Sequence, residues 1–556
     1  MKGRTSLHLF AAVGLPVAVL VACGSPSSRS GFGDDNDAGS SGAFGEGGLG
    51  EGGVSTGIGG RDPVSCDEAA QFKTYVGCDY WPTVTDNLVN DVFDFAVAVA
   101  NGGSDPADVT VTGPGGVNKK ITVAGGTIGK VYLPWVSALK AKGSLSGGAG
   151  LKASVLATKS AYHLVSNKPV VVYQFNPLEF KAVGGEPGKN WSACKIQAPA
   201  TECYSYSNDA SLLLPSTAMT GNYRLLGPAG WSANGGLGLQ AIAPSYFVVT
   251  GTVDGTKVTV KLGPKGAVVG GSGVSTTANN GTLTFSLDAG DVAEVIGTNG
   301  QEGDFSGSLL KADHPVQVIT GISCIDVPSD VQACDHVEET VFPAETLGKH
   351  YVVMRPAGPK KNNVGQVVRF VGNVDATALT YKPSQPAGCP AFLNAGQVAD
   401  CGVVSTDFEV SGDKEFGIAT FQVGGALADP DFNPNSPTPV QPQGDPSQSF
   451  VVTVEQYRKN YVFLAPTDYK TSFVDIIGGA GTTVTLDGTD ISSKLTAIVG
   501  TGYFGGHIQL GQGKDGVHVL DASDPIGIQV IGYGENTSYQ YPGGLNLSAI
   551  SAAPVK

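Results

Sequence analysis

Three short sequence phrases recur along the chain in a fixed order, and this repetition constrains the fold more than any other feature. One phrase is a polar residue, often followed by Pro, and then an apolar run. It reads NKPVVVYQF at Asn167, DHPVQVITG at Asp313, DKEFGIATF at Asp413 and DPIGIQVIGYG at Asp524. The third copy lacks the proline. A recurring set of similar segments indicates repeated structural modules.

A second phrase opens a module, and a third lies between the other two. The second reads GNYRLLGPAG at Gly221, GKHYVVMRPAG at Gly348 and RKNYVFLAPTD at Arg458. The third reads VDGTKVTVKL at Val253, VDATALTYKP at Val374 and GTTVTLDGTD at Gly481. The first module shows only the apolar-run phrase clearly. The pattern predicts four modules in tandem, with boundaries at 63–206, 207–340, 341–449 and 450–556.

The repeated segments have the composition of β-strands. Runs such as SYFVVTGTVDGTKVTVKL, GQVVRFVG and TTVTLDG are rich in Val, Thr and aromatic residues, and Gly, Asp or Pro bound them. Helix-like runs are scarce in this chain, which has 80 Gly and 33 Pro. Short strands with frequent turns predict an all-β protein of tandem β-sandwich modules. We expect the last strand of each module to begin after a turn fixed by Pro.

The N-terminus predicts export. Lys2 and Arg4 precede an apolar run that fits a secretory signal peptide over residues 1–22. The sequence LVAC, ending at Cys23, resembles the lipobox of bacterial lipoproteins, in which the cysteine carries the lipid. An ordinary signal peptide with an incidental cysteine is the alternative. Residues 23–62 are rich in Gly and Ser, which predicts a disordered tether. Gly24 follows the cysteine instead of Asp, which favours the outer membrane or cell surface.

Charge and cysteine content agree with an exported binding protein. The net charge of −15 and the lack of a basic cluster argue against a nucleic-acid partner. Eight cysteines remain after Cys23, and an even number in an exported chain indicates disulfides. Eight cysteines allow 105 connectivities. Their clustering favours the sequence-local pairs Cys66–Cys78, Cys194–Cys203, Cys324–Cys334 and Cys389–Cys401.

The second and third modules carry a set of ordered motifs that resemble one known family. The motifs are SNDASLLLP at Ser207, GNYRLLG at Gly221, APSYFVVTGTVDGTKVTVKL at Ala243, LDAGDVAEV at Leu287, DFSGSLLKADHPVQVITGISC at Asp304, CDHVEETVFP at Cys334 and LGKHYVV at Leu347. They resemble the IgGFc-binding protein N-terminal domain family over about 162–353, with a more diverged continuation to SYQYPGG at Ser538. The resemblance implies an extracellular binding or adhesive module. It does not imply that antibody is bound.

The resemblance also implies a role for the stretch CDHVEE, which begins at Cys334. In the family, a Cys-x-His-[Leu/Val]-x-Glu pattern recurs here before an apolar residue and Pro, and Cys334, His336, Glu339 and Pro343 match it. The pattern is typical of a structural link between two sandwiches, with Cys334 bonded to Cys324. Zinc binding is the alternative, but Cys334 and His336 supply only two of about four ligands, and oxidised cysteines cannot ligate.

No sequence motif selects a catalytic site, and we predict no catalytic residue, metal or cofactor. The one G-x-S-x-G match, GVSTG at Gly53, lies in the Gly/Ser-rich tether and not between a strand and a helix. No motif selects a carboxylate pair for glycoside hydrolysis, and no EF-hand loop is present. Calcium in the turn loops stays open. Tyr533, Tyr539 and Tyr541 cluster near the C-terminus and are candidate binding residues, because exposed tyrosines give large contact area. Tyrosines packed over the last strand are the alternative.

Together these features predict a non-catalytic cell-surface lipoprotein that binds an extracellular protein or glycan. A secreted hydrolase acting on an envelope or extracellular polymer is one alternative function. A structural component of the envelope or matrix is another.

Overall fold

The computed structural model describes residues 62–554 apart from 144–149, 195–202, 235–239, 299, 301–302, 332–333, 434, 437–440, 468, 512 and 514–515. The signal peptide, Cys23 and nearly all of the tether lie outside these residues. The described residues belong to one compact unit, Gly53–Lys556. They form antiparallel β-sheets and two short helices, α1 (Cys66–Phe72) and α2 (Gly425–Ala428). The predicted all-β class is confirmed. None of the described helices is long and apolar enough to cross a membrane.

The first module forms a seven-stranded sheet with β7 at its centre. Its strands are β1 (Gly77–Tyr80), β2 (Phe95–Asn101), β3 (Ala107–Gly113), β4 (Val117–Val123), β5 (Thr127–Leu133), β7 (His163–Phe175) and β8 (Ala210–Leu212). The remaining strand of this chain region, β6 (Val155–Ala157), pairs with β15 and so extends a sheet of the second module.

The second module is a sandwich with the strand orders β18-β17-β12-β15-β6 and β14-β13-β16-β9, beside the hairpin β10-β11. Its strands are β9 (Asn222–Arg224), β10 (Trp231–Asn234), β11 (Gln240–Ala243), β12 (Ser245–Gly251), β13 (Thr256–Lys261), β14 (Thr282–Leu287), β15 (Val292–Ile296), β16 (Leu309–Ala312), β17 (Val316–Ile325) and β18 (Asp335–Thr340). The strand β13 alternates strictly between buried and exposed residues, as a half-buried strand should.

The third module is a sandwich of two four-stranded sheets, β19-β24-β21-β22 and β23-β20-β25-β26. Its strands are β19 (His350–Val353), β20 (Gln366–Gly372), β21 (Thr377–Lys382), β22 (Phe392–Leu393), β23 (Val398–Val404), β24 (Phe408–Gly412), β25 (Phe416–Gln422) and β26 (Gln448–Phe450).

The fourth module is built around the 18-residue strand β33. Its strands are β27 (Arg458–Leu464), β28 (Thr471–Gly479), β29 (Val484–Leu486), β30 (Thr489–Asp490), β31 (Thr496–Ala497), β32 (Tyr503–Gln509), β33 (Val517–Gly534) and β34 (Thr537–Pro542). The exact residues at which the four modules divide stay a prediction.

The repeated apolar-run phrase marks the place in each module where the chain passes from one set of strand neighbours to another. In the second module a strand, β17, does begin directly after Pro315, but β18 and not β17 is the last strand. In the third module β25 begins at the same place of the phrase, where Glu415 stands instead of Pro, and β26 follows it. In the first and fourth modules the prediction that the last strand begins after a Pro turn is also wrong, because Pro169 and Pro525 lie inside the continuous strands β7 and β33. The residues of β7 before Pro169 pair with β3, whereas those from Val171 onwards pair with β2. Proline has no N–H to donate and is tolerated where strand pairing changes.

In each module, a buried tyrosine binds the backbone at the place where the strand neighbours change. Its hydroxyl donates a hydrogen bond to the carbonyl of the residue after the Pro or its equivalent. The pairs are Tyr80 to Val170 at 2.6 Å, Tyr223 to Val316 at 2.7 Å, Tyr351 to Phe416 at 2.5 Å, and Tyr461 to Ile526. In the last three modules this tyrosine is the one in the second phrase. The repeated phrases therefore meet in space, and Tyr80 supplies the same contact in the first module.

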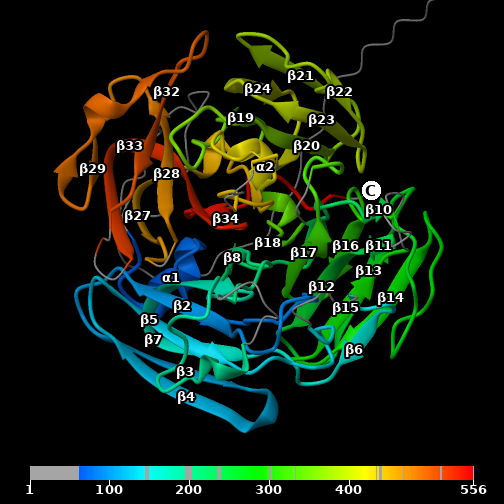
Figure 1. Ribbon diagram of the computed structural model, residues 1–556. Coiled ribbons are helices and arrows are strands. Elements are labelled where there is room, and N and C mark those ends of the chain that lie inside the picture. Colours follow the sequence, from blue (N-terminus) through cyan, green and yellow to red (C-terminus); the bar gives the residue numbers. More distant parts are fainter. Residues whose placement is uncertain are drawn as a thin grey trace, which may run out of the picture. The chain divides into compact units, whose positions relative to one another are not determined.

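Four short strands, one from each module, lie side by side at the centre of the compact unit (Figure 1). They are β8, β18, β26 and β34. Each pairs with the strand of its own module that contains the apolar run of the phrase, which is β7, β17, β25 or β33, respectively, and which we call the crossing strand. Adjacent members of this set contact one another, and β34 contacts β8, so the set closes. We call these four strands the inner ring.

Polar side chains of the inner ring join each module to the one before it. Glu338 on β18 accepts a 2.8 Å hydrogen bond from Gln174 of the first module. Gln448 on β26 donates to the Thr320 hydroxyl of the second module. Gln540 on β34 donates to the Thr420 carbonyl of the third module at 3.0 Å. The second, third and fourth modules thus each contribute one of these residues. Each residue forms a hydrogen bond with the crossing strand of the preceding module.

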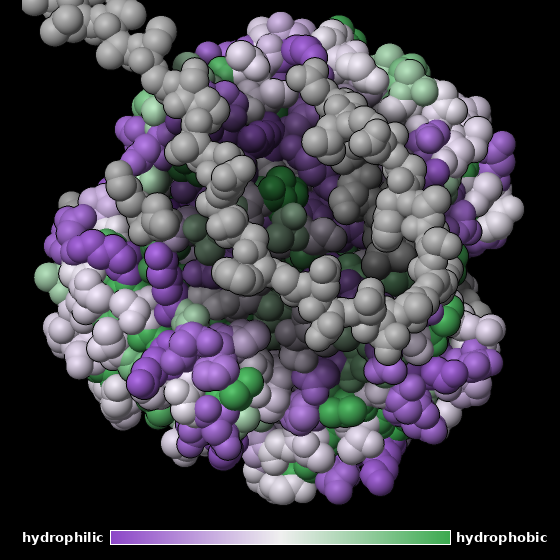
Figure 2. All heavy atoms as spheres, turned by 180° about the vertical axis from the view of Figure 1, so that it is seen from behind, coloured by the Kyte–Doolittle hydropathy of each residue, from purple (hydrophilic) through white to green (hydrophobic). Residues whose placement is uncertain are grey.

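Backbone hydrogen bonds between residues near the two ends of the described chain also join the fourth module to the first. The amide of Tyr75 donates to the carbonyl of Leu545 at 3.2 Å, and the amide of Leu547 donates to the carbonyl of Lys73 at 2.8 Å. On the face drawn in Figure 2, hydrophilic residues form several patches around the rim. One hydrophobic cluster nevertheless runs through all four modules, which agrees with a single compact unit.

Candidate functional site

The stretch CDHVEE begins at the half-buried Cys334, and its residues from Asp335 onwards form the buried start of β18 in the inner ring. His336 is fully buried, and its Nε2 lies 2.8 Å from the hydroxyl of Tyr246. Burial lowers the pKa of His336 to about 3, so the imidazole is neutral at physiological pH. A buried neutral ring in contact with a tyrosine holds a structure together and has no access to a substrate.

The two glutamates of this stretch are also buried and are bound by protein groups. The Glu338 carboxylate accepts hydrogen bonds from Thr85 at 2.5 Å and Ser211 at 3.2 Å, in addition to Gln174. Glu339 accepts from the amide of Leu212 at 3.2 Å. Desolvation raises the pKa of both carboxyls. Pro343 precedes a short helical turn and its carbonyl accepts from the amide of Thr346.

The eight cysteines are bonded as their clustering predicts: Cys66–Cys78, Cys194–Cys203, Cys324–Cys334 and Cys389–Cys401. Cys334 is therefore committed to a disulfide and has no thiolate to give a metal ion. Within the described part of the chain, no group of three or more His, Cys, Asp and Glu side chains is arranged to hold a metal.

The disulfide Cys324–Cys334 closes a loop that forms one wall of a cavity between the second and third modules. The cavity has a volume of about 280 Å³. We call it the seam cavity. Its lining is Pro228, Ala229, Gly230, Trp231, Ile325, Asp326, Val327, Pro328, Ser329, Val367, Arg369, Asp400 and Phe421. Ser329 and Asp400 are exposed, so the cavity reaches the surface beside them.

Trp231 is held against the disulfide loop. Its side chain packs in one cluster with Cys324, Cys334 and Ile325, and its indole N–H donates to the Ser329 carbonyl at 3.3 Å. Across the seam, the amide of Gly424 in the third module donates to the Val327 carbonyl at 2.8 Å. The disulfide, the indole and this backbone contact together fix the shape of the cavity wall.

Arg369 on β20 ties the two modules together at the same place. Its guanidinium lies 3.1 Å from the Asp304 carboxylate of the second module and 2.6 Å from that of Asp400 in its own module. It also donates to the Gly227 carbonyl at 2.7 Å. These two carboxylates raise the pKa of Arg369 further, so its charge is permanent and already compensated.

Asp326 is the chemically distinctive residue of the seam cavity. It is 7% exposed, and none of the described residues donates a hydrogen bond to it. Burial, together with the negative charge of Asp330, raises the pKa of its carboxyl to about 7. A buried carboxyl without a partner usually marks a functional position, because burying a charge is costly unless it is paired.

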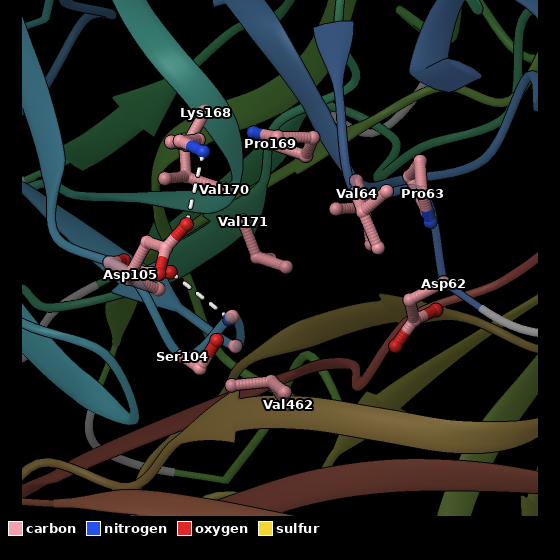
Figure 3. Close-up of a pocket in the computed structure, with 14 residues that line it drawn as sticks. Asp62, Pro63, Val64, Ser104, Asp105, Lys168, Pro169, Val170, Val171 and Val462 are labelled. Atoms are coloured by element: carbon pink, nitrogen blue, oxygen red, sulfur yellow. Dashed lines mark hydrogen bonds and ion pairs between the residues drawn. The ribbon is translucent and has the colours of Figure 1, made fainter.

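A second cavity lies between the first and fourth modules and has a volume of about 190 Å³ (Figure 3). Lys168 and Asp105 face one another at its edge, 3.1 Å apart. Asp62 on the opposite side is paired with Arg458. These charged groups are paired with one another, so the seam cavity, with its unpaired Asp326, is the better candidate for ligand binding.

A family model described as IgGFc binding protein matches residues 209–532. The chain belongs to the IgGFc-binding protein family. The matched residues contain the second and third modules, the whole seam cavity and most of the fourth module. The family is of the binding type and is not known for enzymes. No curated protein and no solved structure matches the chain significantly.

The three C-terminal tyrosines are buried and therefore form no binding surface. Tyr533, Tyr539 and Tyr541 are 1% exposed or less. Their hydroxyls donate to the carbonyl of Ala357, the hydroxyl of Ser472 and the carbonyl of Leu464, respectively. The prediction of exposed contact residues is corrected. Tyr539 and Tyr541 lie on β34, an inner-ring strand that strands of three modules contact, and Tyr533 lies on β33 against Ala357 of the third module.

Sequence reasoning missed the residues that line the seam cavity. Trp231 directly follows the second phrase, and Asp326 lies between two paired cysteines, so each had a local signal. Nothing in the sequence places either of them beside Arg369, because that contact joins two modules. Cys23, the predicted lipid attachment site, lies outside the described residues.

Proposed function

We propose that this protein is a non-catalytic surface protein that binds an extracellular ligand, protein or glycan, in the seam cavity between its second and third modules. The observation that carries this proposal is the seam cavity itself, within the residues matched by a binding-type family. It combines a buried indole, an unpaired buried carboxyl and a wall fixed by a disulfide. Such cavities, mostly apolar with a few placed polar groups, are typical ligand sites.

The rest of the molecule supports this site. The inner ring and the four tyrosine contacts hold the modules in one compact unit, so the two walls of the seam cavity keep a fixed distance. A preformed site loses less conformational entropy on binding than one that must assemble. Disulfide bonding supports an extracellular location. We further propose that Cys23 carries a lipid that anchors the protein in a bacterial envelope, with the binding modules held away from the membrane by the tether.

The test compares two tryptophan variants in the full chain carrying Cys23→Ser, which keeps the protein soluble. Wild type, Trp231→Ala and Trp191→Ala are screened against extracellular proteins, immunoglobulin Fc among them, and against a glycan array. Trp191 is a matched control, because its indole also donates to a backbone carbonyl, that of Gly184, but far from the seam cavity. Loss of binding only in Trp231→Ala is expected. Equal binding by all three would contradict the proposal.

A further inference from the structure

We infer that the seam cavity accepts a single cationic side chain, a lysine ammonium or an arginine guanidinium, presented by a protein partner. This inference rests on the proposed function and names the chemistry of its ligand. It starts from the carboxyl of Asp326, which is nine-tenths buried, lines the cavity and has no hydrogen-bond donor among the described residues.

The charged groups around Asp326 leave a place for one positive charge. Asp330 lies on the same loop, and the buried Asp445 lies close enough for its charge to interact with Asp326. Both are acids. The cation that lines the cavity, Arg369, is bound by Asp304 and Asp400 instead. The guanidinium is thus paired with Asp304 and Asp400. An entering cation would pair with Asp326, the carboxyl that lines the cavity and receives no hydrogen bond from the described residues.

The apolar part of the cavity suits the stem of a long basic side chain. Trp231, Val367 and Phe421 line the cavity together with Asp326. Lysine and arginine bury their methylene groups against apolar surfaces while the charged end finds a polar partner. A cation close to an indole is further attracted by the ring electrons. The lining therefore fits both halves of such a side chain.

The size and position of the cavity favour a side chain over a larger ligand. Its volume of about 280 Å³ is just below the ~300–1,000 Å³ of typical small-molecule sites. Exposed Ser329 and Asp400 at its edge let a side chain enter from a partner outside. An anion would be repelled by the carboxyls. A metal ion lacks enough ligands, because no suitable group of three exists among the described residues.

The experiment titrates the full chain carrying Cys23→Ser with Nα-acetyl-lysine methylamide and with its uncharged norleucine analogue, by calorimetry. Saturable binding of the lysine compound at pH 8 is expected, together with at least tenfold weaker binding of the norleucine compound. Asp326→Asn should weaken binding of the lysine compound at least tenfold. Asp524→Asn, an exposed aspartate in the fourth module, should leave it unchanged.

Ionisation of Asp326 gives the titration a pH dependence. With a carboxyl pKa of about 7, roughly nine-tenths of the side chain is charged at pH 8 and one-tenth at pH 6, so affinity for the lysine compound should fall roughly tenfold between them. The other charged groups near this site are Asp330, Asp445, Arg369 and the two carboxylates that bind Arg369, Asp304 and Asp400. Asp326→Asn should remove most of the fall. Equal binding of both compounds, or no effect of Asp326→Asn, would overturn the inference.

Failure of the cation inference and failure of the proposed function give different experimental results. A macromolecular ligand that requires Trp231 but tolerates Asp326→Asn, or a glycan bound at this site, would overturn the cation inference and leave the binding function intact. Binding of the lysine compound without any ligand that depends on Trp231 would overturn the proposed function alone.

Discussion

The hydroxyl of Tyr223 donates a 2.7 Å hydrogen bond to the carbonyl of Val316, 93 residues further along the chain. The same hydroxyl accepts from the amide of Thr220 at 3.2 Å. One side chain thus joins the opening strand of the second module to its crossing strand. Tyr351 and Tyr461 make both contacts in the following modules. Similar tyrosine corners stabilise other β-sandwiches.

Tyr223→Phe should lower the free energy of unfolding by about 1–3 kcal/mol, because it leaves the buried carbonyl of Val316 and the half-buried amide of Thr220 without their partner. Chemical denaturation followed by circular dichroism measures the loss. Tyr206→Phe is the control, since this side chain is 40% exposed and should change stability much less. A Tyr223→Phe variant as stable as the control would show that the tyrosine contact does not hold the module.

Asp86→Asn should flatten the pH dependence of stability between about pH 4 and 6. Burial raises the pKa of the fully buried Asp86 from 3.8 to about 6, so the folded state binds a proton that the unfolded state releases. The stabilisation is complete below pH 4 and is lost as pH rises to about 6, which amounts to ~3 kcal/mol.

Denaturation curves at several pH values measure this effect. The wild type should lose stability over that pH range by about 1.4 kcal/mol per pH unit more than Asp86→Asn does. Asp524→Asn, at an exposed position, should keep the wild-type slope. An unchanged slope in Asp86→Asn would contradict the buried, protonated state of this carboxyl.

Replacing both Cys324 and Cys334 by Ser should lower the free energy of unfolding by about 2–3 kcal/mol, from the loop entropy of a ten-residue closure. It should also weaken ligand binding, because the loop forms a wall of the seam cavity. Replacing Cys66 and Cys78, which close a loop of similar length in the first module, is the matched control, with a similar loss of stability and normal binding. Chelators should leave the melting curve of the oxidised protein unchanged, and a large chelator-induced shift would reopen the zinc interpretation.

The sequence predicts those features of the structure that depend on residues close together in the chain or on repeated segments. The all-β class, the repeated phrases and the four local disulfides follow from short segments such as the one around Cys324. The inner ring could not be predicted, because β8 is only three residues long and its partners belong to other modules. Tyr539 looked exposed for the same reason: strands far along the chain cover it. Tyr80 was missed as a repeat of Tyr223 because the sequence around it has diverged.

Cys23→Ser should move the protein from the membrane fraction to the soluble fraction of the cell envelope, since a lipid on this cysteine is the proposed anchor. Fractionation and immunoblotting measure the change, and metabolic labelling with an alkyne fatty acid reports the lipid itself. Cys66→Ser, which breaks a disulfide instead, should keep the protein in the membrane fraction. Full membrane retention of Cys23→Ser would rule out this anchor.

The central claim is that ligands bind between the second and third modules, and hydrogen exchange of the protein with and without its bound partner tests it most directly. The account predicts that protection appears in the backbone of residues 228–231 and 325–331, which form the wall of the seam cavity, and is lost with Trp231→Ala. Protection confined to the first or fourth module, with no change in these two segments, would contradict it.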